Sequence, residues 1–173
     1  MKRLLIAVLS TAVLLVAANH RLFAATALVF PKNSAAAFSV QLPQGWSATD
    51  DNKGTLTLSS PGLPVAVSLI VLDNATVAAQ MSVAQLANMA LQPTNASSIY
   101  KQVPGSISGM DGTTYFASSK SGDGTAVDLK LTVLVINARY IVMEIVGTPT
   151  VMTPALETSL KSVTKGITLK VAK

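Results

Sequence analysis

The chain of 173 residues contains no cysteine, one histidine and one tryptophan, and only 12% of its residues are charged. The absence of cysteine excludes disulfide bonds, so the fold must be held together by its core alone. It also excludes a lipid attached through a cysteine that follows an export signal. We therefore expect a free protein rather than a lipid-anchored one.

The single histidine, His20, lies beside an N-terminal apolar run. If cleavage falls after Ala27, the remaining chain has neither histidine nor cysteine. This excludes nucleophiles that depend on a neighbouring histidine, typical zinc sites and the usual general base near neutral pH. A glycine-rich phosphate loop is also lacking. The sequence therefore predicts no catalytic residue, no cofactor-binding residue, no metal ligand and no cofactor.

The N-terminus is typical of an export signal, because Lys2 and Arg3 precede an apolar run from Leu4 to Ala18. As a helix this run would extend roughly 22 Å at ~1.5 Å per residue. That is shorter than the ~30 Å hydrocarbon core of a membrane. A cleaved signal is therefore favoured, and a permanent membrane anchor is the alternative.

Small residues suited to cleavage occur at residues 16–18 and again at 25–27, and the second set defines a predicted signal peptide over residues 1–27. Cleavage there removes three basic residues and no acidic one, so 10 basic and 8 acidic residues remain and the formal charge falls from +5 to +2. No run of lysine or arginine follows, so no nucleic-acid partner is predicted. We expect a bacterial protein that is periplasmic or secreted and meets the membrane only through its uncleaved signal.

After a predicted linker at residues 28–35, residues 36–173 are predicted to form a single domain. The spacing of apolar residues predicts seven strands, at residues 38–42, 55–60, 65–72, 99–103, 113–118, 127–135 and 140–147. Residues 43–54 contain turn-forming Gly, Asp and Asn and are interpreted as a turn.

Two helices interrupt the strands. The first has the apolar spacing of one helix face and begins at a capping box formed by Ser82 and Gln85. The second begins with Thr153 as its cap and Pro154 at its first position, and ends at Gly166. The order of three strands, helix, four strands and helix predicts an α+β fold, a mostly antiparallel β-sheet flanked by helices.

The stretches FSVQLPQGW, TLTLSS, VAVSLIVLD and ISGMDGTTY, with a helix near Ser82 and a closing helix, resemble the PsbP-like fold group over roughly residues 36–170. That group includes PsbP, the Ran-binding Mog protein and the bacterial protein DcrB. DcrB is the most similar in its cellular location, because it is an envelope protein. The resemblance implies an α/β/α sandwich and a non-enzymatic role, usually that of binding or assisting another protein. DcrB is anchored through a lipid on a cysteine, which this chain lacks.

The expected function is that of an exported accessory protein, not an enzyme, which binds or assists another envelope protein. The alternative is a carrier of a small apolar ligand or lipid, with a cleft between sheet and helix. A hydrolase is a third alternative, for which suitable residues are lacking. A large apolar pocket would favour the carrier, and a broad exposed patch without a cavity would favour the accessory protein.

Trp46 follows Pro43 and Gly45 at the end of a predicted strand. Proline cannot donate to a strand ladder, so Pro43 ends the strand, and Gly45 allows the chain to bend. We expect the indole to fold back over the end of the core. The alternative is an exposed anchor for a binding partner.

The acidic residues are interpreted as turn or surface residues. Asp50-Asp51-Asn52 and Gly122-Asp123-Gly124 could contact a calcium ion, but neither has the spacing of a dedicated loop. Glu144 lies within a predicted strand and could be an acid with a raised pKa, but we expect it to be exposed. Ser119-Lys120 is not a catalytic dyad, because adjacent strand residues point to opposite faces.

Overall fold

The structure is a computed structural model that describes residues 27–32, 34–73, 80–136 and 139–170. Most of the predicted signal peptide, including His20, lies outside these residues. The described elements are, in chain order, β1 (Leu28–Phe30), β2 (Phe38–Val40), β3 (Ser47–Asp50), β4 (Thr55–Ser59), β5 (Ala66–Asp73), α3 (Val83–Leu91), η2 (Gln92–Thr94), β6 (Lys101–Ile107), β7 (Met110–Lys120), β8 (Ala126–Val135), β9 (Tyr140–Pro149), α4 (Pro154–Lys165) and β10 (Ile167–Leu169).

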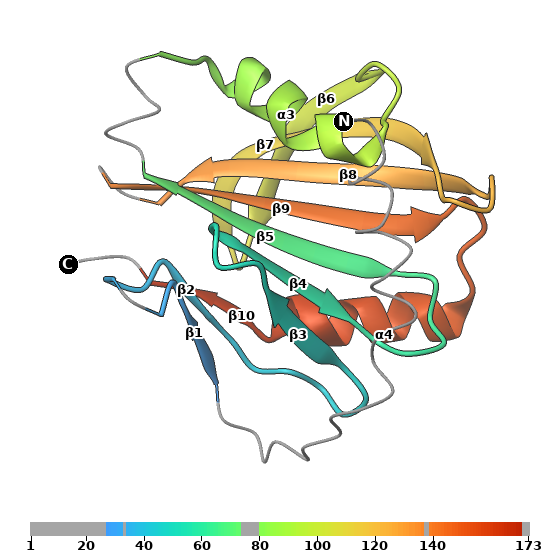
Figure 1. Ribbon diagram of the computed structural model, residues 1–173, viewed down its shortest axis with the longest axis horizontal. Helices are drawn as coiled ribbons and strands as arrows, with labels where there is room; N and C mark the ends of the chain where they lie inside the picture. Colours follow the sequence, from blue (N-terminus) through green and yellow to red (C-terminus); the bar gives the residue numbers. More distant parts are fainter. Residues whose placement is uncertain (1–26, 33, 74–79, 137–138, 171–173) are drawn as a thin grey trace.

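A seven-stranded sheet dominates the fold, with the strand order β3-β4-β5-β9-β8-β7-β6 (Figure 1). Every neighbouring pair in it is antiparallel. Strands β6 to β9 follow one another along both the chain and the sheet, as expected for a series of hairpins. The predicted α+β class with a mostly antiparallel sheet is confirmed.

The two helices lie against opposite faces of the sheet. In β9, Met143 and Ile145 belong to the apolar cluster that includes the buried side of α3. Val142 and Val146 belong to the cluster that includes Leu156 and Val163 of α4. Because successive strand residues point to opposite faces, this alternation places α3, the sheet and α4 in three layers, as in an α/β/α sandwich.

Strands β1, β2 and β10 form a second, small sheet with β2 in the centre. Phe30 of β1 stacks on Phe38 of β2 with 5.3 Å between the ring centroids, and both side chains belong to the core cluster on the α4 side. The interpretation of residues 28–35 as a linker was therefore wrong for Leu28–Phe30, which is strand β1. Strands of three residues are too short to show a period in the sequence.

Two further strand predictions need correction. β3 lies within residues 43–54, which were interpreted as a turn, and β6 continues through Pro104, where the predicted strand ended. β6 is the edge strand of the sheet, and proline is tolerated there because one side of an edge strand has no partner for its N–H groups.

The α4 side of the large sheet is only partly covered. Seven strands at ~4.8 Å spacing make a sheet roughly 29 Å wide, whereas one helix is ~10–12 Å across. The buried residues of α4 pack into the cluster that contains core residues of β4 and β5. Near β6 and β8 the same face bears the exposed side chains of Lys101 and Lys130. None of the described helices is both long enough and apolar enough to cross a membrane.

Candidate functional site

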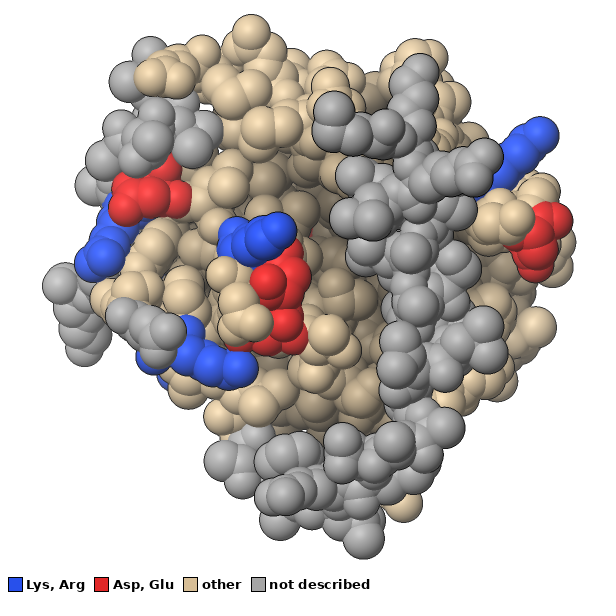
Figure 2. Space-filling model, in the orientation of Figure 1, with Lys and Arg blue, Asp and Glu red and all other residues tan. Residues whose placement is uncertain are grey.

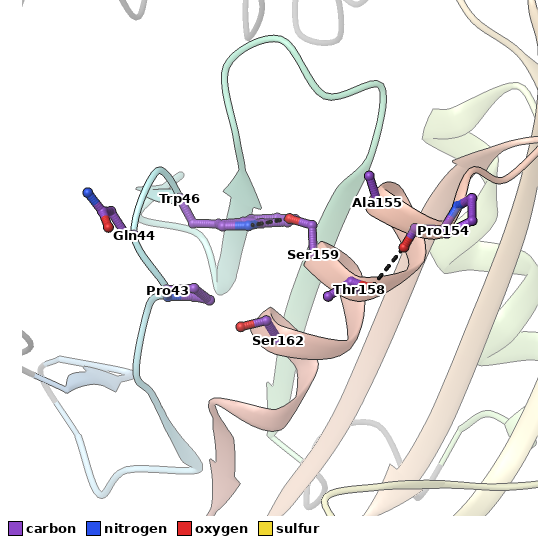
Figure 3. Close-up of a pocket in the computed structure, with 8 residues that line it drawn as sticks. All are labelled: Pro43, Gln44, Trp46, Pro154, Ala155, Thr158, Ser159 and Ser162. Carbon is purple, nitrogen blue, oxygen red and sulfur yellow. Dashed lines mark hydrogen bonds between the residues drawn. The ribbon is translucent and has the colours of Figure 1, made fainter.

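A hollow of about 590 Å³ lies between the loop before β3 and one side of α4 (Figure 3). Trp46 forms one wall of it and is only 9% exposed. Its Nε1 donates a hydrogen bond of 3.1 Å to Oγ of Ser159 on α4, which Figure 3 draws as a dashed line. The prediction of a buried Trp46 is confirmed, and the indole fixes α4 against the core.

A tight turn brings the indole to this position. The N–H of Trp46 donates to the carbonyl of Pro43 at 3.1 Å, and Gly45 between them has a φ of 82°. That value suits the third position of a type II turn, which favours glycine. The sequence Pro-Gln-Gly-Trp is thus a turn that returns the indole to the sheet.

A second hollow, which we name the lysine groove, lies over β6 to β9 where α4 leaves the sheet uncovered. Its volume is about 500 Å³, and it is lined by Tyr100, Lys101, Phe116, Asp128, Leu129, Lys130, Val146, Thr148, Met152 and Leu160. The strands form the floor of the groove. Met152 lies just before α4, and Leu160 lies in the middle of that helix. The groove therefore combines an apolar interior with charged residues.

Lysines stand on either side of an aromatic ring in this groove. Phe116 is the cross-strand partner of Lys101 on β6 and of Lys130 on β8. The Lys101 Nζ lies 5.2 Å from the Phe116 ring centroid, within range of a cation–π interaction. Tyr100, the residue before Lys101, is 61% exposed. This part of the groove combines aromatic and cationic side chains.

The adjacent row of the same sheet face is polar and buried. Thr114, Thr132 and Glu144 are direct neighbours across β7, β8 and β9, and the two threonine hydroxyl oxygens lie 2.9 Å apart. Glu144 is only 5% exposed, so the expectation of an exposed carboxyl was wrong. The alternation of residues along the strand placed Glu144 on the face opposite its apolar neighbours, but it could not show that both faces of β9 are buried.

Burial raises the pKa of Glu144, while the charge of Lys130 acts in the opposite direction. Burial dominates because removing a carboxylate from water disfavours its ionised form. The carboxyl thus lies in the row beside the one that carries the two lysines. This is a perturbed acidic group next to a groove, a combination that occurs at functional sites and also in purely structural networks.

The other acidic candidates have the turn roles expected of them. Asp50 accepts from the backbone N–H of Asn52 at 2.8 Å and lies 3.0 Å from Lys32 Nζ. The Lys32 ammonium, and then the backbone N–H, lower the pKa of Asp50. Asp123 accepts from Ser121 and from the Thr125 N–H, and these hydrogen bonds lower its pKa to about 2.

No metal-binding group stands out in the part of the chain that the structure describes, where no three acidic or histidine side chains gather. Figure 2 shows few charged side chains on one face of the molecule, and acidic and basic side chains lie close together there. Ser119 donates to the carbonyl of Thr94, and its neighbour Lys120 follows it on the same strand, β7.

Sequence reasoning did not find the lysine groove. The alternation of Lys130 and Asp128 with Leu129 indicated a polar face, but not what lies beside it. The groove depends on the register that sets Phe116 between two lysines and on the width of sheet left uncovered. Neither is visible from one strand alone.

No model of a known protein family and no curated protein matches the chain. Solved structures do. The cyanobacterial PsbP protein (CyanoP) of Synechocystis is 10% identical, with a TM-score of 0.50 over 90% of this chain and 99% of that one. The Mycobacterium tuberculosis protein LpqN, involved in cell envelope biogenesis, is 13% identical, with a TM-score of 0.49 over 84% and 90% of the two chains.

Two weaker similarities accompany them. The Ran-binding protein Mog1p of Saccharomyces cerevisiae is 10% identical, with a TM-score of 0.48 over 77% of this chain and 90% of that one. A structure from Bacteroides thetaiotaomicron is 14% identical, with a TM-score of 0.41, and the chain spans 45% of its length. At such identities the comparison with CyanoP shows the fold alone, and that fold is the PsbP-like one that the sequence resembled.

Proposed function

We propose that this protein is an exported accessory protein, not an enzyme, that binds another protein of the bacterial envelope in a DcrB-like role. The lysine groove is the proposed binding site. One observation carries the proposal: Tyr100, Lys101, Phe116 and Lys130 gather in one hollow over β6 to β9, beside α4. Aromatic residues are enriched in protein interfaces, where a few of them supply much of the binding energy.

A carrier of a small apolar ligand is the second candidate, because the groove lies between the sheet and α4 and has Val146, Met152 and Leu160 in its lining. Carrier sites bury most of the ligand surface, typically ~70–90% of it. Here Tyr100, Lys101 and Lys130 are exposed. An exposed rim fits a protein partner better than an enclosed lipid.

The proposal is tested by affinity purification from the native organism with mass spectrometry. The baits are the parent protein, Tyr100→Ala in the groove, and Val83→Ala as a matched control. Val83 is 38% exposed on α3, on the opposite face of the sheet. We expect one envelope protein to be enriched with the parent and the control, and to be depleted with Tyr100→Ala. Enrichment of lipid in place of protein would support the carrier.

Export is a separate part of the proposal with its own test. N-terminal sequencing of the protein from the envelope fraction should begin near Asn19 or Leu28, the residues that follow the two cleavage patterns. Intact Met1 in a membrane pellet would instead favour the membrane anchor.

A further inference from the structure

We propose that the partner segment that enters the lysine groove is acidic, with carboxylates on either side of an apolar side chain. This inference rests on the proposed function and adds the chemistry of the partner. It is drawn from the charges and the apolar surface of the groove.

The charges of the groove favour an acidic partner. Lys101 and Lys130 are separated by one strand, which puts their Cα atoms roughly 10 Å apart at ~4.8 Å per strand. Among the residues that the structure describes, neither lysine forms an ion pair. Two ammonium groups of one sign, both exposed, attract an anionic partner and disfavour a cationic one.

The carboxylates nearby leave this charge only partly balanced. Asp128 lies in the groove lining, one row beyond the two lysines. Glu144 is buried, and burial raises its pKa, so it neutralises Lys130 less than an exposed carboxylate would. The two lysines therefore leave positive charge that is available to a partner.

The apolar surface between the two lysines favours an apolar side chain in the same partner segment. Phe116 is half-buried, as are Met152 and Leu160, and each lines the groove. A purely polyanionic ligand would leave this surface in contact with water. A segment with an apolar side chain between two acidic ones would cover the ring and place a carboxylate at each lysine, where burial and charge both favour binding.

The test is a titration with two labelled synthetic peptides, one with glutamate residues on either side of a leucine–phenylalanine pair and one with glutamines in their place. We expect the parent protein to bind the glutamate peptide roughly tenfold or more tightly, since hydrogen bonds to charged groups are the stronger kind. Lys101→Glu combined with Lys130→Glu should remove this preference, and added salt should weaken it. Lys53→Glu, in the exposed turn between β3 and β4, is the matched control and should retain it.

Each outcome separates this inference from the proposed function. Equal binding of the two peptides would overturn the proposal of an acidic segment. So would a loss of the preference for the glutamate peptide in Lys53→Glu as large as in the double variant. If the double variant still captured the same envelope protein as the parent, the accessory function would stand and this inference would fail. Tighter binding to anionic phospholipid vesicles than to the glutamate peptide would also overturn it. Capture of no envelope protein by the parent would instead defeat the proposed function.

Discussion

Replacing Trp46 with alanine should remove one of the larger contributions to the core. The side chain is 9% exposed and belongs to the cluster between the sheet and α4. A buried aromatic removes ~150–250 Å² from water, which at ~25 cal/mol per Å² is roughly 4–6 kcal/mol. Alanine retains part of that contact, so we expect Trp46→Ala to lower the free energy of unfolding by ~3–5 kcal/mol.

The hydrogen bond to Ser159 is the smaller part of this effect. Ser159 is half-buried, so its hydroxyl can bind water when the indole is absent. Ser159→Ala should therefore cost only ~1 kcal/mol, the usual net value of such a bond. Packing, and not the hydrogen bond, then accounts for most of the loss.

Urea unfolding measures these differences. The parent can be followed by tryptophan emission, because Trp46 is the only tryptophan, and Trp46→Ala by far-ultraviolet circular dichroism. Tyr100→Ala is the matched control, since Tyr100 is an aromatic side chain that is 61% exposed, and its loss should change stability by no more than ~0.5 kcal/mol. A parent that emits as a solvated indole, with a Trp46→Ala variant as stable as the parent, would refute the packing argument.

Three further changes test other parts of the fold by the same unfolding assay. Ser82→Ala removes the cap of α3, where Oγ accepts from the Gln85 N–H at 3.3 Å, and should cost ~1 kcal/mol; no loss would mean that this cap contributes nothing. Gly112→Ala should destabilise by ~1–3 kcal/mol, because a Cβ there would meet the Val133 carbonyl, whereas Gly122→Ala meets nothing within 4 Å; equal effects would contradict this. Burial raises the pKa of Glu144 in the folded state, so the stability it contributes is full at pH values below its unfolded pKa and is lost as the pH rises through its folded pKa. Glu144→Gln stays neutral and should therefore gain stability relative to the parent as the pH rises above the ordinary pKa of a glutamate, and a difference that is independent of pH would contradict the burial argument.

Local signals in the sequence were sufficient for much of the fold. The capping box at Ser82 and Gln85 is present in the structure, and α4 begins at Pro154 with Thr153 as its cap, as predicted. These features depend on residues within one turn of each other, so a single stretch of sequence contains them. The long strands β8 and β9 were equally visible through their apolar pattern.

Features that depend on distant pairing could not be predicted in the same way. β1 is stabilised by its pairing with β2, and β10 pairs with the other edge of that strand. Glu144 is buried because neighbouring strands and the α4 layer surround it, although its own strand gave no sign of this. The lysine groove likewise depends on the register of β6, β7 and β8.

Site-specific photo-crosslinking can show whether this protein binds another protein at the lysine groove. A photoreactive phenylalanine analogue would replace Tyr100 in the groove or, as the control, Val83 on the opposite face, in the native organism. We expect an adduct with one envelope protein from position 100 and none from position 83. No protein adduct at position 100, or the same adduct at both positions, would contradict it.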